Sequence, residues 1–171
     1  MKVLGIDPGL AATGVGLVWG EGMRPQGYSY GCIQTRSNEE TGDRLERIYS
    51  RLCQLIDTER PDLIVIEDIF SLNVYPHSGI TLGKVSGVIL LAGRQAKVPM
   101  VEVAVREAKQ VLTGNGNAGK KQLELSVRRL IGATEPVRPT HAADALGLAL
   151  IGLYRKHPEG SDRTLSERSK R

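Results

Sequence analysis

The stretch Lys2 to Gly16, KVLGIDPGLAATGVG, decides how the rest of the chain is interpreted. The run from Val3 to Ile6 is short and apolar, as is typical of a buried β-strand, and it ends on Asp7. A proline and a glycine follow and favour a turn, so a returning strand is expected from Thr13 to Trp19. Ligands of α/β folds bind where strands emerge from the core, which makes Asp7 a candidate functional residue. A structural alternative is that Asp7 only caps the turn.

Length and composition favour a single globular domain, expected to span residues 1–156, with 40% hydrophobic residues in a chain of 171. The segment from Arg155 to Arg171 holds six Lys or Arg against three acids, so it carries most of the net charge of +4. Residues 157–171 lack hydrophobic periodicity and are predicted to form a charged, disordered tail. Cys32 and Cys53 are too few for a disulfide framework, and neither a signal peptide nor a membrane span is visible. These features predict a cytoplasmic protein.

The remaining pattern alternates between strands and helices, which predicts an α/β fold with a mixed central β-sheet flanked by helices. The unbroken β-branched run before Glu67 is typical of a strand buried on both faces. Strands are expected at Tyr28 to Thr35, Leu63 to Ile66 and Met100 to Val103, and loops at Ser71 to Ser78 and Thr113 to Gly119. Helices are expected at Thr41 to Glu59, Gly79 to Ala96, Arg106 to Leu112, Lys120 to Ile131 and His141 to Tyr154.

The last predicted helix combines an apolar composition with two chemically active side chains. It is rich in Ala, Leu and Gly, so it is expected to be buried, yet it carries His141 and Asp144. Residues three positions apart lie on one face of a helix. A buried carboxylate needs a cation, a metal or several donors as partners. The alternative is that Asp144 forms a structural salt bridge with an arginine or caps the start of the helix.

The three acids Asp7, Glu67 and Asp144 are predicted to converge, two from neighbouring strand ends and one from a helix across the sheet. Three carboxylates and one phosphodiester carry four negative charges, which two divalent ions neutralise. Hard oxygen ligands suit Mg²⁺ or Mn²⁺, and two such ions can activate a water and stabilise a leaving 3′ oxygen. His141 would add a neutral ligand or accept the proton of that water.

These residues stand in three blocks that occur in a distinctive order. The blocks are GIDPGL at Gly5 to Leu10 with TGVG at Thr13 to Gly16, IVIEDIF at Ile64 to Phe70, and HAADALGLAL at His141 to Leu150. With them the sequence resembles, to about Tyr154, the RuvC family of Holliday junction resolvases, which have a ribonuclease H-like fold.

The resemblance implies an endonuclease that binds four-way DNA junctions as a homodimer, in homologous recombination and DNA repair. It implies symmetric paired nicks that leave 5′-phosphate and 3′-hydroxyl ends, with Asp7, Glu67, His141 and Asp144 around divalent metal. It also implies joint action with a branch-migration helicase complex of the RuvA and RuvB type. Many members of the family have Asp at the position of His141. The histidine removes one negative charge from the site, so metal preference and pH dependence are left open.

The resemblance also implies a DNA-binding surface. Phe70 matches the aromatic residue that stacks on junction bases, although a lone Phe after a strand is also typical of a core. Lys109 and Lys120 match phosphate-contacting lysines, and Arg106 and Lys121 extend this basic stretch around the glycine loop. Solvated surface lysines are the alternative. The helix from Gly79 to Ala96 corresponds to the dimer helix of the family, or to simple core in a monomer.

Three other functions are compatible with parts of the pattern. A nuclease of the same fold that matures ribosomal RNA shares the first motif and a late acidic helix. The stretch GIDPGLAATGVG also resembles the phosphate-binding hairpin of actin-like proteins, but the chain is too short for their second half. A protein that binds junctions without cleaving them would require structural roles for all three acids.

Overall fold

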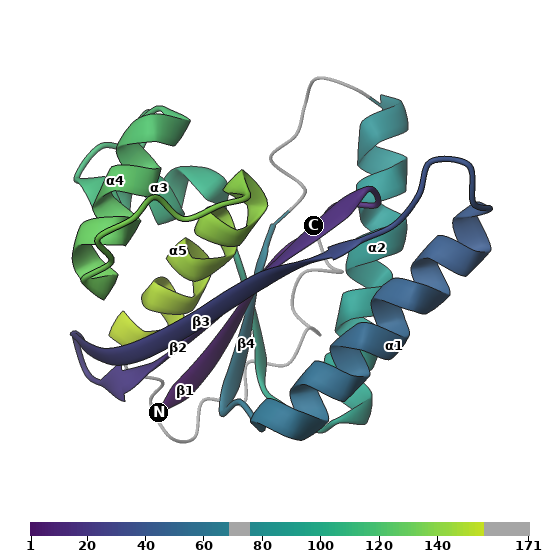
Figure 1. The fold of residues 1–171 in the computed structure, drawn as a ribbon, viewed down its shortest axis with the longest axis horizontal. Coiled ribbons are helices and arrows are strands. Elements are labelled where there is room, and N and C mark those ends of the chain that lie inside the picture. Colours follow the sequence, from purple (N-terminus) through teal and green to yellow (C-terminus); the bar gives the residue numbers. More distant parts are fainter. Residues whose placement is uncertain (69–75, 156–171) are drawn as a thin grey trace, which may run out of the picture.

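A computed structural model describes residues 1–68 and 76–155 of the chain (Figure 1). The described strands form one five-stranded sheet with the order β3-β2-β1-β4-β5. β1 pairs antiparallel with β2 and parallel with β4, and β5 runs parallel to β4, which confirms the predicted mixed sheet. The strands are β1 (Lys2–Asp7), β2 (Ala12–Glu21), β3 (Arg24–Gln34), β4 (Leu63–Glu67) and β5 (Met100–Val103).

Helices cover both faces of this sheet, so the fold has three layers (Figure 1). On one face lie α1 (Thr41–Glu59) and α2 (Pro76–Gln95), which pack on the sheet through one hydrophobic cluster. On the other face lies α5 (Thr140–Tyr154), with α3 (Val105–Thr113) and α4 (Lys120–Ile131) packed against it in a second cluster. None of the helices within the described ranges is long and apolar enough to cross a membrane.

The largest differences from the sequence-based expectation are at the start of α2 and in the hairpin of β2 and β3. α2 begins at Pro76, inside the predicted loop from Ser71 to Ser78, because a proline is well tolerated in the first turn of a helix, where its missing N–H leaves no bond unmade. The hairpin of β2 and β3 is longer than predicted and turns at Gly22, which has a φ of +57°. A register shift between Trp19 and Gly20 lets pairing continue to the turn.

Three glycines in β1 and β2 bring α5 unusually close to the sheet. A Cβ atom on Gly5 would lie 2.0 Å from the carbonyl oxygen of Ala145, and one on Gly16 would lie 2.5 Å from the amide nitrogen of Leu146. At Gly14 a Cβ would lie 2.0 Å from the carbonyl oxygen of His141. Any side chain at these positions would therefore push the helix backbone away. α5 is buried along nearly all of its length, as its composition predicts.

The importance of this close contact between α5 and the glycines can be tested with Gly16→Ala. The added methyl group meets helix backbone, which cannot rotate away, so we expect the free energy of unfolding to fall by about 3 kcal/mol. The matched control is Gly31→Ala in β3, where the new Cβ would meet only Cγ2 of Val15 at an ordinary 3.7 Å. Urea unfolding of both variants measures the difference, and equal stability would show that α5 does not depend on the glycine.

Candidate active site

Two carboxylates meet at one edge of the sheet because β1 and β4 are parallel neighbours. Ile6 pairs with Ile66, so the residues that follow, Asp7 and Glu67, lie side by side at the ends of their strands. Each carboxyl group perturbs the pKa of the other, which agrees with this proximity. The first two predicted site residues are therefore brought together as expected.

The start of α5 adds His141 to this pair. Gly14 is the register partner of Asp7 and lies directly beneath the carbonyl of His141, so the helix can reach the strand end. Nδ1 of His141 and Oδ2 of Asp7 are hydrogen-bonded over 2.6 Å. The turn after β1 is held instead by Thr13, whose hydroxyl donates to the carbonyl of Gly9 over 2.8 Å. Asp7 thus faces the histidine and Glu67 rather than capping its turn.

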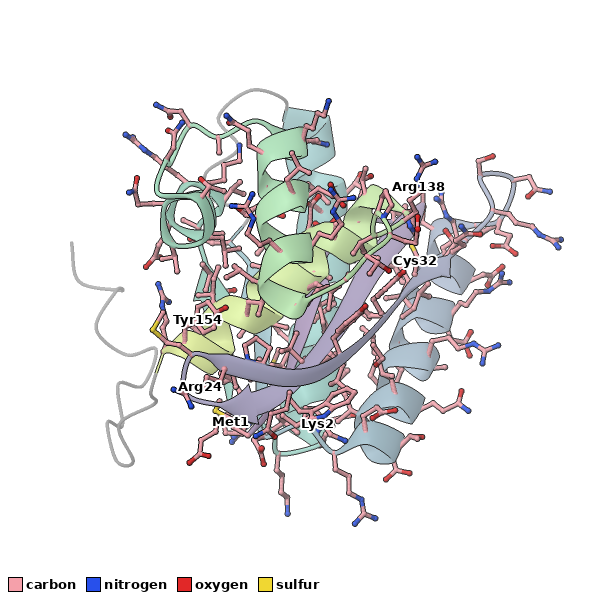
Figure 2. The ribbon with its side chains drawn as sticks, turned by 60° about the vertical axis from the view of Figure 1, so that its left-hand side comes forward. Met1, Lys2, Arg24, Cys32, Arg138 and Tyr154 are labelled. Carbon is pink, nitrogen blue, oxygen red and sulfur yellow. The ribbon has the colours of Figure 1, made fainter. Side chains whose placement is uncertain are left out.

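The site lies at one end of the sheet. Cys32 is the register partner of Gly14 and marks this end, whereas Met1 and Lys2 lie at the other end (Figure 2). Burial and the nearby charge of Asp7 both raise the pKa of the Cys32 thiol, which agrees with this proximity.

A pocket of about 320 Å³ collects the predicted residues. Its polar lining consists of Asp7, Glu67, His141, Asp144, Lys109 and Lys120, and its apolar lining of Val105, Ala108, Leu112, Leu123, Gly147 and Leu148. The apolar walls come from α3, α4 and α5, so three helices enclose the two strand ends. Sequence reasoning missed these apolar residues, since their spacing indicates only amphipathic helices.

Burial among these walls makes ionisation of the strand-end carboxylates costly. The side chain of Asp7 is 9% exposed, and burial raises its pKa to about 7, with the charge of Asp144 adding to the rise. The pKa of Glu67 is raised to about 8. Burial is the largest cause, and repulsion from Asp7 and Asp144 adds to it. Lys120 opposes both shifts. Lys120 therefore offsets only part of the cost of ionising these two carboxyl groups.

Asp144, the fifth residue of α5, lines the same pocket. Burial raises its pKa, while the positive charges of Lys120 and Lys109 and the imidazole of His141 act in the opposite direction. Among the described residues it forms no salt bridge with an arginine, and α5 has no side-chain cap. Neither structural alternative for this carboxylate is therefore observed.

The donor set is chemically suited to a hard divalent cation. Three carboxylates and one imidazole line one pocket. The raised pKa values of Asp7 and Glu67 reflect burial and repulsion that a cation would relieve. Within the described ranges, no three His, Cys, Asp or Glu side chains already stand close enough together to hold a metal ion. The residues thus fit such an ion by chemistry, and Asp7 lies within hydrogen-bonding distance of one other donor, His141.

The other predicted DNA-binding residues are placed less uniformly. Lys109 and Lys120 line the pocket, as expected for groups that contact a phosphate there. Arg106 instead packs along the loop after α3, where a Cβ on Gly116 would lie 3.0 Å from its Cγ, and Lys121 is exposed on α4. Phe70 lies outside the described residues.

Comparison with known proteins agrees with this arrangement. The family model of crossover junction endodeoxyribonuclease RuvC matches residues 3–152. The protein of that name from Syntrophomonas wolfei is 40% identical over 154 residues, which cover 90% of this chain and 89% of the relative. The one from Brevibacillus brevis is 39% identical over 150 residues, covering 88% and 90%.

A solved structure of T. thermophilus RuvC in complex with Holliday junction substrate superposes with a TM-score of 0.82 and 31% sequence identity. The alignment covers 90% of this chain and 97% of that chain. This similarity confirms the expected ribonuclease H-like fold. The matched span includes both strand-end carboxylates and the start of α5, so the chain belongs to the RuvC family of crossover junction endodeoxyribonucleases.

Proposed function

We propose that this chain resolves four-way DNA junctions by paired nicks in two opposing strands, in recombination and repair in the cytoplasm. The observation that carries the proposal is the pocket in which three carboxylates and His141 face two lysines. Carboxylates gathered at one point repel a phosphodiester unless cations intervene, and lysines beside them supply attraction for the flanking backbone. Family membership and the structural similarity to a junction-bound relative support the same substrate.

We assign the cation-binding role to Asp7, Glu67 and Asp144, with His141 as a further ligand or proton acceptor. Two Mg²⁺ or Mn²⁺ ions, when bound, supply charge stabilisation for attack of water on the phosphate and for departure of the 3′ oxygen. Asp7 also accepts the hydrogen bond of His141 Nδ1, which orients the imidazole and leaves Nε2 for a proton. The products would be 5′-phosphate and 3′-hydroxyl ends.

Lys109 and Lys120 are assigned to the phosphates of the bound strand. They stand on α3 and α4, across the pocket from the strand-end carboxylates, and Lys120 acts electrostatically on all three acids. Arg106 and Lys121 are proposed to contact the backbone outside the pocket, and Phe70 to stack on bases at the exchange point. A ribosomal RNA nuclease of the same fold is disfavoured by the match to the junction endonuclease family over residues 3–152.

α2 is proposed to form the homodimer contact. Its buried side, including Val85, Ile89 and Ala92, packs on the sheet. Its exposed side presents a stripe at alternating spacings of four and three residues, as in helix pairs that pack along their length. The stripe consists of Ile80, Lys84, Gly87, Leu91 and Arg94. A Cβ on Gly87 would meet nothing within 4 Å, so a second helix can approach there. Cooperation with a RuvA and RuvB type helicase complex is proposed from the family alone.

The nuclease assignment is tested with Asp7→Asn. The change removes a charge with little change in volume, so we expect cleavage of a synthetic four-way junction in Mg²⁺ to fall at least about 1000-fold. Junction binding measured without metal should change less than about threefold. The control is Asp57→Asn, an exposed acid on α1.

Three substrates are compared in the same assay: the junction, a linear duplex and a DNA:RNA hybrid. Symmetric nicks confined to the junction support the proposal. Preferred cutting of the hybrid would contradict the proposal and favour an RNA nuclease. Loss of junction binding in Asp7→Asn would show that Asp7 has a structural role.

The pH dependence of stability tests the electrostatics of the site. Burial raises the pKa of Asp7 from 3.8 to about 7 and that of Glu67 from 4.5 to about 8, so the folded chain keeps protons that the unfolded chain has released. Because the unfolded state binds fewer protons, the contribution of this pair to the free energy of unfolding falls as pH rises from about 4 to 8. Asp7→Asn should flatten this slope in urea unfolding. An unchanged slope would exclude Asp7 as its source.

Adding Mg²⁺ should restore part of the free energy of unfolding that is lost as the pH rises. The ion binds deprotonated carboxylates, so it should raise the melting temperature more at about pH 8 than at about pH 5. The increase should disappear in Asp7→Asn and persist in Asp57→Asn. Equal stabilisation at both pH values would contradict metal binding by the raised-pKa pair.

The dimer contact is tested with Leu91→Lys. This side chain is 51% exposed, so the fold should tolerate the charge, whereas a helix pair would have to bury it. We expect the dimer dissociation constant to rise at least about tenfold in sedimentation experiments, with loss of paired nicking. Met23→Lys, in the hairpin at 73% exposure, is the control. An unchanged dimer would exclude the stripe as the contact.

A further inference from the structure

The loop between α3 and α4 joins the two lysines of the pocket. Lys109 lies in the middle of α3, Lys120 begins α4, and both line the pocket. The seven residues between Leu112 and Lys120 include three glycines, and Gly114 has a φ of +74°. Glycine loses more backbone freedom on ordering than any other residue. Besides the packing of α3 and α4 on α5, the spacing of the two lysines therefore depends on what fixes this loop.

One side chain, Gln110, bridges the loop through both ends of its amide group. Its Nε2 donates to the carbonyl of Gly114 over 2.9 Å, and its Oε1 accepts from the N–H of Gly116 over 2.9 Å. The backbone carbonyl of Gln110 also accepts the N–H of Gly114 over 3.0 Å, which closes α3. The residue next to Lys109 thus holds two of the three loop glycines.

The rest of the loop is tied in short local steps. The hydroxyl of Thr113 donates to the carbonyl of Lys109 over 2.7 Å and accepts the N–H of Asn115 over 3.1 Å. Oδ1 of Asn115 then accepts the N–H of Asn117 over 2.9 Å. Each of these side chains reaches at most four residues along the chain, whereas Gln110 spans six to Gly116.

Gly116 also lies against the side chain of Arg106. A Cβ there would lie 3.0 Å from Cγ of Arg106 and 3.3 Å from its carbonyl oxygen, so the loop tip packs directly on the first turn of α3. The bond from Gln110 reaches this tip at the N–H of the same glycine. The loop therefore folds back on α3, and the hydrogen bonds of the Gln110 side chain hold it there.

We propose that Gln110 is a positioning residue for the nuclease reaction: its amide clamps the loop of residues 113–119 and thereby sets the distance between Lys109 and Lys120 across the pocket. This inference rests on the proposed function, because it assigns those lysines to the phosphates of the cleaved strand. Gln110 itself is exposed and does not line the pocket. It acts through the lysines, which must be in place when charge develops on the phosphate.

The test compares Gln110→Ala with wild type in single-turnover cleavage of a four-way junction with Mg²⁺. Loss of two hydrogen bonds that fix the lysines should lower the rate about tenfold. Junction binding should change less than about threefold, because the charges remain. Asn117→Ala is the control, since the Asn117 side chain makes no hydrogen bond within the described part of the chain, and it should cleave like wild type.

A double-mutant cycle with Lys120→Ala separates positioning from general loosening. If Gln110 acts by placing Lys120, then Gln110→Ala should cause little further loss in the Lys120→Ala background. A full additional tenfold loss there, or wild-type rates in Gln110→Ala alone, overturns the inference. So does a parallel fall in rate and melting temperature.

Hydrogen exchange of the Gly116 amide reports on the clamp without catalysis. It should be protected in the wild-type protein and exchange at least about tenfold faster in Gln110→Ala. An unprotected Gly116 amide in the wild type overturns the clamp even if cleavage is normal. A wild-type chain with a protected amide but no junction cleavage would instead overturn the proposed function.

Discussion

The close seat of α5 on the glycines of β1 and β2 is the constraint on which the site depends. Because Gly5, Gly14 and Gly16 have no side chains, the helix backbone lies where Cβ atoms would otherwise stand. Only at this distance can His141 donate to Asp7, since the reach of an imidazole is short. A helix raised by one methyl layer would still pack on the sheet but would separate the helix-borne groups from the strand ends.

The close packing of α5 on the sheet brings acidic side chains together, and the surrounding helices increase the cost of ionising them. The apolar residues of α3, α4 and α5 exclude water from three acids, which raises the pKa of each. The nearby lysines reduce the shifts but do not remove them. A site of this kind favours cation binding, because a bound cation neutralises the carboxylates and so offsets the free-energy cost of burying them together. The same walls would strengthen the interaction of bound ions with a phosphate.

Much of this arrangement could be predicted from local patterns, and the remainder depends on contacts between distant elements. Asp7 and Glu67 each follow an apolar run, and the composition of α5 indicates burial, so these features are visible in the sequence. The bond between His141 and Asp7 depends on where α5 lies over Gly14, which no local pattern specifies. The clamp proposed for Gln110 could not be predicted for a similar reason, since an exposed glutamine near a helix end has no distinctive pattern.

β4 contributes side chains to the hydrophobic clusters on both faces of the sheet. Its Ile64 and Ile66 belong to the cluster beneath α1 and α2, whereas Leu63 and Val65 belong to the cluster beneath α5. This alternation follows from the two-residue period of a strand, and the strand then ends on Glu67 in the pocket. β4 thus contributes both to the cluster beneath α2, where the dimer contact is proposed, and to the site through Glu67.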